Sequence, residues 1–209
     1  MVTETERPLR ADAARNAERI LRTARAVFAD VGPDAQLEEI ARRAGVGART
    51  LYRHFPTKAD LVRAALGQSI AEDLTPAVEQ ALDDDDPLRG LVSLMEAALR
   101  LAARDLSTLA AARNAGTLTA EVYTPFYESL TELARRAQAA GLLRADLVPD
   151  DLPRIMAMLT STLWSMDPDG DGWRRYLALV FDGLSPAAAH PLPPAATLLK
   201  GPRPGDWLL

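Results

Sequence analysis

The sequence contains no cysteine and only two histidines, His54 and His190, which lie far apart along the chain. The absence of cysteine excludes a disulfide framework, cysteine-ligated zinc, iron–sulfur clusters and thiol catalysis. Two distant histidines are too few for a histidine-rich metal site. The two absences exclude these thiol and histidine sites, and we also expect no metal, no cofactor and no catalytic group in this protein.

Long apolar runs are also missing from the sequence. No stretch approaches the ~18 consecutive apolar residues that would span a bilayer, and residues 1–12 lack the apolar centre of a secretion signal. The sequence therefore predicts a cytoplasmic protein with no membrane partner. Aromatic residues contribute only 5% of the 209 positions, whereas alanine, leucine and arginine are abundant, a balance that favours helices over strands.

Basic residues are outnumbered overall, because the net charge is −5, but the charge is unevenly distributed. Residues 1–66 carry 12 basic and 9 acidic side chains, whereas residues 67–209 carry 12 basic and 20 acidic ones. Between Ile40 and Ala59 there is no acidic residue, and the basic residues are Arg42, Arg43, Arg49, Arg53 and Lys58. Such a local cluster suits a phosphate backbone, since charge interactions are screened within about 8–10 Å at physiological salt. The alternative is an ordinary solvated helix face.

The region 12–31 is predicted to be a helix, because its apolar residues recur at three- and four-residue steps. The pair Gly32-Pro33 ends this pattern. Further along, Thr57 and Asp60 make a Thr-x-x-Asp capping box, which predicts the start of another helix.

Two short helices are predicted in between, over about 37–44 and 48–54, with Gly45 ending the first and Pro56 ending the second. Two short helices joined by a three- or four-residue turn that contains glycine are typical of a helix-turn-helix. In that motif the second helix lies in the major groove of DNA. The same spacing also fits a compact three-helix cluster without this function.

Three segments of this region carry a family resemblance. They read Phe-Ala-Asp-Val-Gly from Phe28, Leu-Glu-Glu-Ile-Ala-Arg-Arg-Ala-Gly-Val-Gly from Leu37, and Thr-Leu-Tyr-Arg-His-Phe-Pro-Thr-Lys-Ala-Asp-Leu from Thr50. Together, over about residues 13–66, they resemble the DNA-binding domain of TetR-family transcriptional regulators. Gln36 departs from the family, which usually has Ser or Thr there to cap the second helix, so we expect Asp34 to provide that cap.

The resemblance implies that the helix over about 48–54 contacts a palindromic double-stranded DNA operator. The residues expected at this contact are Gly47, Ala48, Arg49, Thr50, Tyr52, Arg53, His54 and Lys58. Hydroxyl groups and the lysine charge suit phosphate oxygens. Arg49 can donate to both O6 and N7 of guanine, or it can contact a phosphate. His54 has no recognisable nucleophile or carboxylate partner, so we do not expect it to be catalytic.

Residues 67–184 read as a further set of helices, and the resemblance implies that they form a ligand-binding and dimerisation domain. Between the middle helices, six side chains that mix apolar bulk with a few hydroxyl groups are candidates for a small-molecule pocket. They are Met95, Tyr123, Phe126, Tyr127, Met156 and Trp164. The alternative for each is an ordinary core position.

The last two predicted helices, over about 149–166 and 173–184, carry apolar residues on more than one face. We expect them to form a two-fold interface with a second copy of the chain, although an intrachain core is the alternative. The candidate interface residues are Ile155, Leu159, Leu163, Tyr176 and Val180. Such a homodimer would place two recognition helices on half-sites about 34–36 Å apart.

The predicted fold class is all-α, with a three-helix helix-turn-helix domain over 13–66 and a helical ligand-binding and dimerisation domain over 67–184. Residues 1–12 are expected to form a flexible arm, and six prolines predict an extended or mobile tail over 185–209. The expected function is that of a transcriptional repressor that a small-molecule ligand releases from its operator. Two alternatives are a ligand-independent architectural DNA-binding protein and a helical enzyme that uses His54.

Overall fold

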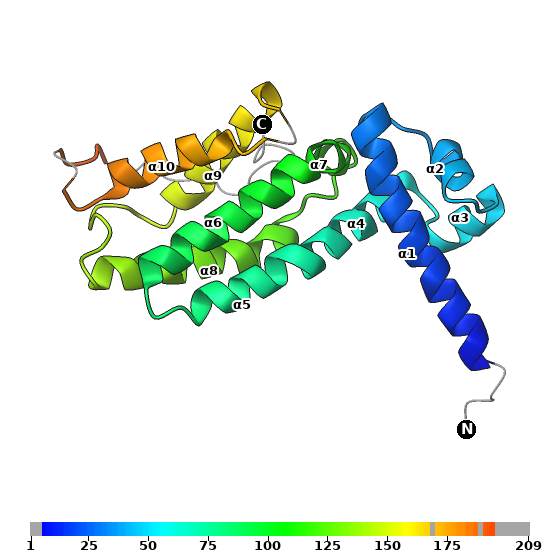
Figure 1. Cartoon of the computed structure of the whole chain (residues 1–209), viewed down its shortest axis with the longest axis horizontal. Coiled ribbons are helices and arrows are strands. Elements are labelled where there is room, and N and C mark those ends of the chain that lie inside the picture. Colours follow the sequence, from blue (N-terminus) through cyan, green and yellow to red (C-terminus); the bar gives the residue numbers. More distant parts are fainter. Residues whose placement is uncertain (1–5, 168–169, 188–189, 195–209) are drawn as a thin grey trace. The chain divides into compact units, whose positions relative to one another are not determined.

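The computed structural model describes residues 6–167, 170–187 and 190–194, and all regular structure within these ranges is helical (Figure 1). This confirms the all-α prediction. In chain order the elements are α1 (Glu6–Val31), α2 (Leu37–Arg43), α3 (Ala48–His54), α4 (Lys58–Ser69), a π-helical turn (Ile70–Leu74), α5 (Thr75–Leu82), α6 (Pro87–Arg104), α7 (Leu106–Asn114), α8 (Ala120–Ala139), α9 (Asp151–Thr162), a 3₁₀ turn (Leu163–Ser165) and α10 (Trp173–Leu184). Over the described ranges, none of the helices combines the length and the apolarity that a membrane span needs.

The chain divides into two compact units. The first contains the chain up to Gln68 together with Asp105–Thr117, so α7 packs with α1 although it lies far along the sequence. The second contains Ser69–Arg104 and the chain from Leu118 onward. By sequence, α7 falls in the predicted domain over 67–184, because the pattern of a helix does not identify the helices against which it packs.

The first unit is built around an apolar centre to which several helices contribute. α1 packs against α2 and α7, and α2 packs against α3. The fully buried side chains here include Ile20, Ala24, Val27 and Phe28 of α1, Ile40 of α2, Leu51 of α3, and Leu61 and Val62 of α4. This core fixes the side of α3 that faces inward, and it thereby determines which side of α3 faces solvent.

Helix α1 begins at Glu6, earlier than the periodicity of its apolar residues predicted. Residues 6–12, which were expected to belong to a flexible arm, form its first turns, while residues 1–5 lie outside the described residues. Pro8 is compatible with this position, because the first N–H groups of a helix have no acceptor within the helix.

In the second unit, α6 packs against α5, α8 and α9 (Figure 1). A Cβ atom at Gly90 of α6 would lie 2.5 Å from the carbonyl oxygen of Ala81, so glycine permits the close approach of α5 and α6. The guanidinium group of Arg136 on α8 donates to the carbonyls of Leu82 at 2.8 Å and Asp84 at 2.9 Å. These bonds satisfy carbonyl groups at the end of α5.

The start of the predicted tail is held by Arg144 and Asp146, in the loop that precedes α9. The Arg144 guanidinium donates to the carbonyls of Gly183 at 3.0 Å and His190 at 2.8 Å. Asp146 accepts the N–H of Leu192 at 2.8 Å. Residues 188–189 and 195–209 of the predicted tail lie outside the described residues.

Candidate nucleic-acid interface

The turn between α2 and α3 is fixed by hydrogen bonds that end α2. Gly45 has a left-handed backbone conformation with φ +64°. Its N–H donates to the Arg42 carbonyl at 3.2 Å, and the Val46 N–H donates to the Ala41 carbonyl at 3.0 Å. This pair of bonds is a Schellman motif, which needs a residue that tolerates positive φ. The predicted helix-turn-helix geometry is therefore present, with Gly45 at the position where glycine is required.

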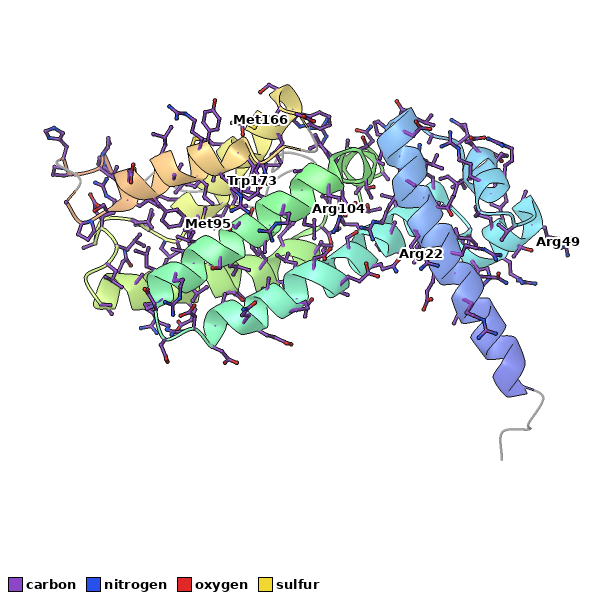
Figure 2. The ribbon with its side chains drawn as sticks, in the orientation of Figure 1. Arg22, Arg49, Met95, Arg104, Met166 and Trp173 are labelled. Atoms are coloured by element: carbon purple, nitrogen blue, oxygen red, sulfur yellow. The ribbon has the colours of Figure 1, made fainter. Side chains whose placement is uncertain are left out.

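Helix α3 buries one side and exposes the other. Leu51 is fully buried, whereas the exposed side chains of α3 are those of Ala48, Arg49, Tyr52 and Arg53. Figure 2 shows the Arg49 side chain extending away from α3 at the edge of the first unit. Because residues three and four apart share one face of a helix, Arg49, Tyr52 and Arg53 form a single exposed surface. Thr50 and His54 are half-buried beside it.

The start of α2 differs from the expectation that Asp34 caps it. The N-cap residue is Gln36, and its side chain makes no capping hydrogen bond. Instead, the Gln36 amide donates to the main-chain carbonyl of Asp34 at 3.1 Å. Glu38 and Glu39 lie in the first turn of α2, where carboxylates interact favourably with the helix dipole.

The capping box at the start of α4 is confirmed. The Asp60 N–H donates to Thr57 Oγ1 at 3.1 Å, and the Thr57 N–H donates to Asp60 Oδ2 at 3.2 Å. Helix α4 begins at the next residue, Lys58, whose ammonium group lies 5.9 Å from the centre of the Phe28 ring. That distance is within the range of a cation–π interaction.

The four arginines of the predicted basic cluster fall into two classes. Glu39 accepts hydrogen bonds from Arg42 at 2.8 and 2.7 Å and from Arg43 at 2.6 Å, and these bonds lower the pKa of Glu39 to about 2. Arg43 also pairs with Asp30 at 2.7 Å. In contrast, Arg49 and Arg53 make no ion pair within the part of the chain that the structure describes.

The hydroxyl group of Tyr52 is engaged by a carboxylate that the sequence analysis did not single out. It donates to Oε1 of Glu38 at 2.7 Å, which joins α3 to the first turn of α2. This hydrogen bond lowers the pKa of Glu38 and raises the pKa of Tyr52. The two residues are fourteen positions apart, and no spacing rule within a helix links them.

His54 is placed unfavourably for catalysis. Its Nε2 atom is buried and has no hydrogen-bond partner, and its ring packs against Phe55 with ring centres 6.2 Å apart. Among the described residues, no cluster of three or more His, Cys, Asp or Glu side chains could hold a metal ion.

The six candidate pocket residues are dispersed over four elements of the second unit. Met95 on α6 and Met156 on α9 are buried, whereas Trp164 is 47% exposed. Tyr123, Phe126 and Tyr127 gather on α8, where the Phe126 and Tyr127 rings meet edge to face at 5.1 Å. Neither tyrosine hydroxyl has a hydrogen-bond partner in the described structure, and burial raises the pKa of Tyr123 to about 12 and raises that of Tyr127 as well.

The candidate dimer residues also separate into two groups. Ile155, Leu159 and Leu163 are buried within the chain itself. Tyr176 is 42% exposed and Val180 is partly exposed. The large apolar side chains that α9, α10 and the 3₁₀ turn expose are Met158, Trp164, Tyr176 and Leu179. Of these four, only Tyr176 was among the candidate dimer residues, because apolar periodicity alone does not distinguish the two apolar faces of a helix.

A small pocket of about 120 Å³ lies on the second unit, at a place that the sequence did not indicate. Its lining residues are Thr131, Ala134, Arg135, Gln138, Leu147, Val148, Pro149 and Leu152. The Gln138 amide borders it and donates to the carbonyls of Arg144 and Leu147, both at 2.9 Å.

Two family models match the chain. Residues 20–65 match the model described as bacterial regulatory proteins of the tetR family. Residues 86–186 match the model for the C-terminal domain of SbtR-like transcriptional regulators. The two matches cover most of α1–α4 and most of the second unit.

Individual relatives agree with these models. The solved structure of a TetR transcription regulatory protein from Mycobacterium vanbaalenii is 37% identical, with a TM-score of 0.55 over 85% of this chain and 99% of that one. A curated HTH-type transcriptional regulator of Mycobacterium tuberculosis is 38% identical over 96 residues, which are 46% of this chain and 49% of the relative. The transcriptional repressor LfrR of Mycolicibacterium smegmatis is 42% identical over 81 residues, 39% of this chain and 38% of the relative. The matched segments thus span about half or less of these curated relatives.

Proposed function

The chain belongs to the TetR family of bacterial regulatory proteins, and from this premise we propose that it is a sequence-specific DNA-binding transcriptional repressor. In this proposal α3 enters the major groove of a palindromic operator. The first unit carries the DNA contact, and the second carries ligand binding and dimerisation. The name of LfrR, a transcriptional repressor, supports repression over activation.

The observation that carries the proposal is the exposed face of α3. Arg49 and Arg53 are solvent-exposed cations without an ion pair in the described structure, and the buried Leu51 fixes the helix so that this face points outward. A guanidinium group at the leading turn of a recognition helix can donate to both acceptors of guanine. Arg53, at the far end of α3, suits a phosphate.

We propose that two chains associate through the exposed apolar face of α9 and α10. Met158, Tyr176 and Leu179 offer apolar area without a cover in a single chain. Burying it against the same face of a second copy gives a two-fold arrangement. Two recognition helices then address half-sites about 34–36 Å apart, which explains why the operator is expected to be palindromic.

We propose that the effector is a small molecule with an apolar body and at least one polar group. Tyr123 and Tyr127 present hydroxyls that lack hydrogen-bond partners in the described structure, beside the Phe126 ring. A partly buried hydroxyl without a partner is stabilised when a bound ligand offers it a hydrogen-bond acceptor or donor. The effector must prefer the state that does not bind DNA, because equal affinity for both states shifts nothing.

The enzyme alternative receives no support from His54, whose Nε2 atom is buried without a partner. A general base has to reach a substrate proton, directly or through one water. We therefore propose no catalytic role for this chain. The architectural alternative differs from the regulator in two measurable respects, because it predicts neither a preferred sequence nor an effector.

Selection from a random duplex library tests the proposal. The wild-type chain should enrich a palindromic sequence, and Arg49→Ala should reduce the enrichment at defined base positions. Arginine residues on the second unit provide a control, and Arg135→Ala should enrich the same sequence as the wild type. Enrichment of no sequence by the wild type would reject the regulator and favour the architectural protein.

A further inference from the structure

We propose that Glu38 lowers the affinity of the helix-turn-helix for DNA of every sequence, because it holds the Tyr52 hydroxyl and places a carboxylate beside the phosphate that this hydroxyl would contact. The inference rests on the proposed DNA-binding function and adds a residue to it. Glu38 lies on α2 and not on the recognition helix, so its role is to set the strength of binding.

The Tyr52 hydroxyl has a single hydrogen to donate. Its O–H group donates to Glu38 Oε1 at 2.7 Å. Phosphate oxygens accept hydrogen bonds, so Tyr52 can bond a phosphate only by donating the same hydrogen. A hydrogen bond from Tyr52 to a phosphate therefore requires that the bond to Glu38 is broken, and the carboxylate then loses its hydroxyl partner.

The negative charge of Glu38, unlike that of its neighbour Glu39, is not compensated by an arginine in the described residues. The neighbouring carboxylate of Glu39 is compensated by Arg42 and Arg43. Glu38 is exposed and makes no ion pair in the described residues, so its charge acts on whatever approaches Tyr52. The hydrogen bond from Tyr52 also lowers the pKa of Glu38, so the group is ionised at neutral pH.

Both effects weaken the contact with phosphate and not the contact with a particular base. They should therefore lower the affinity for all DNA sequences alike. Phosphate contacts carry no sequence information, so removal of the Glu38 charge should strengthen binding to all duplexes by a similar factor. Repulsion between two unit charges several ångströms apart in partly aqueous surroundings corresponds to a change on the order of three- to tenfold per subunit. Added salt should reduce the gain, because it screens exposed charges.

Glu38→Gln tests the proposal in the full-length chain. Glutamine keeps the length of the side chain and removes the charge. Fluorescence anisotropy with a labelled random-sequence 30-base-pair duplex, and with the duplex enriched by selection, should give tighter binding to both at low salt, by about three- to tenfold for each subunit that contacts the duplex. Glu128→Gln, an exposed residue of α8 with the same change in net charge, should leave both affinities within twofold of the wild type. Weaker or unchanged binding by Glu38→Gln would overturn the proposal.

The same substitution in a Tyr52→Phe background separates the effect of the hydrogen bond to Tyr52 from the effect of the Glu38 charge. Phenylalanine cannot donate to Glu38, so the gain from Glu38→Gln should be smaller in this background than in the wild type. An equal gain in both backgrounds would reject the part of the proposal that involves the Tyr52 hydroxyl.

A readout without DNA distinguishes failure of this inference from failure of the proposed function. Ultraviolet titration, with Tyr52→Phe used to identify the signal of Tyr52, should give a lower pKa for Tyr52 in Glu38→Gln than in the wild type, because the carboxylate raises that pKa. If the wild type binds no duplex, the proposed function fails while the titration still reports the hydrogen bond. If the titration shows no change, the hydrogen bond is absent in solution and the inference fails.

Discussion

The Nε atom of Arg25 on α1 lies 3.3 Å from Oδ1 of Asp105, the residue that precedes α7. The two residues are 80 positions apart, and the Asp105 side chain is only 4% exposed. This ion pair joins the two stretches of chain that make up the first unit. Removal of one member of a buried ion pair is destabilising, so the pair has a direct consequence for stability.

Replacement of Arg25 by methionine should therefore destabilise the first unit. We expect a loss of about 2–4 kcal/mol in the free energy of unfolding, somewhat less than for a fully buried pair because Arg25 remains partly exposed. Urea denaturation measures the loss. Arg22→Met is the matched control on the same helix (Figure 2), since Arg22 is exposed, and it should change stability by less than about 0.5 kcal/mol. Equal effects of the two substitutions would contradict the role assigned to the pair.

Lys58 and Arg49 should affect DNA binding in different ways. Lys58 lies at the start of α4, where it suits a phosphate. Lys58→Ala should weaken binding about equally on all sequences, and in a dimer it should reduce the slope of log affinity against log salt by about two. If Arg49 reads guanine, Arg49→Ala should cost roughly 1–3 kcal/mol per half-site on the preferred operator and much less where that base is changed. A uniform loss for Arg49→Ala would assign this residue to phosphate instead.

A charge on the exposed face of α10 should separate the proposed dimer. Leu179 is 55% exposed, so Leu179→Glu should preserve helix content and thermal stability of the chain, while sedimentation should change from dimer to monomer at micromolar concentration. Leu142→Glu, at an apolar position that is 39% exposed outside α9 and α10, is the control and should remain dimeric. Leu159 is unsuitable for this test, because it is buried and a charge there would unfold the chain. A wild-type chain that sediments as a monomer would refute the dimer.

Acid should weaken the helix-turn-helix through Glu39. Its hydrogen bonds with Arg42 and Arg43 depress its folded-state pKa from 4.5 to about 2. A depressed carboxyl pKa contributes stability above its unfolded value, and that contribution is lost as the pH falls from about 4.5 towards 2. Glu39→Gln should therefore show a smaller decrease in melting temperature over this pH interval than the wild type, in calorimetric scans at low salt. Identical profiles would mean that the hydrogen bonds are not populated in solution.

Two glycines should respond to alanine in opposite ways. Gly90→Ala would place a Cβ atom 2.5 Å from the Ala81 carbonyl oxygen, so α5 and α6 would have to separate, with an expected loss of about 1–3 kcal/mol. Gly67 lies within α4 with nothing within 4 Å of an added Cβ. Gly67→Ala should stabilise the protein by about 0.5–1 kcal/mol, because alanine is the better helix former. Denaturant titration of both variants provides the comparison.

The features that the sequence predicted are those determined by short-range rules. Gly45, the Thr57–Asp60 capping box and the boundaries of α10 depend on neighbouring residues, and the structure agrees with each of them. The pairs Glu38–Tyr52 and Arg25–Asp105 could not be predicted, because each joins residues on different helices whose approach is decided by packing. For the same reason, the periodicity of α9 did not distinguish the buried Leu159 from the exposed Met158.

The composition of the first unit from two separate stretches of chain has a consequence for synthesis on the ribosome. Helices α1–α4 leave the exit tunnel first, but the buried partner of Arg25 follows only with Asp105, and α7 is complete only at Asn114. The proposed recognition helix is thus translated well before the unit that supports it is complete. A gene fragment that ends after α4 encodes every proposed DNA-contacting residue and still lacks part of the core. A chimaera that joins the first unit to a different ligand-binding domain must therefore include α7.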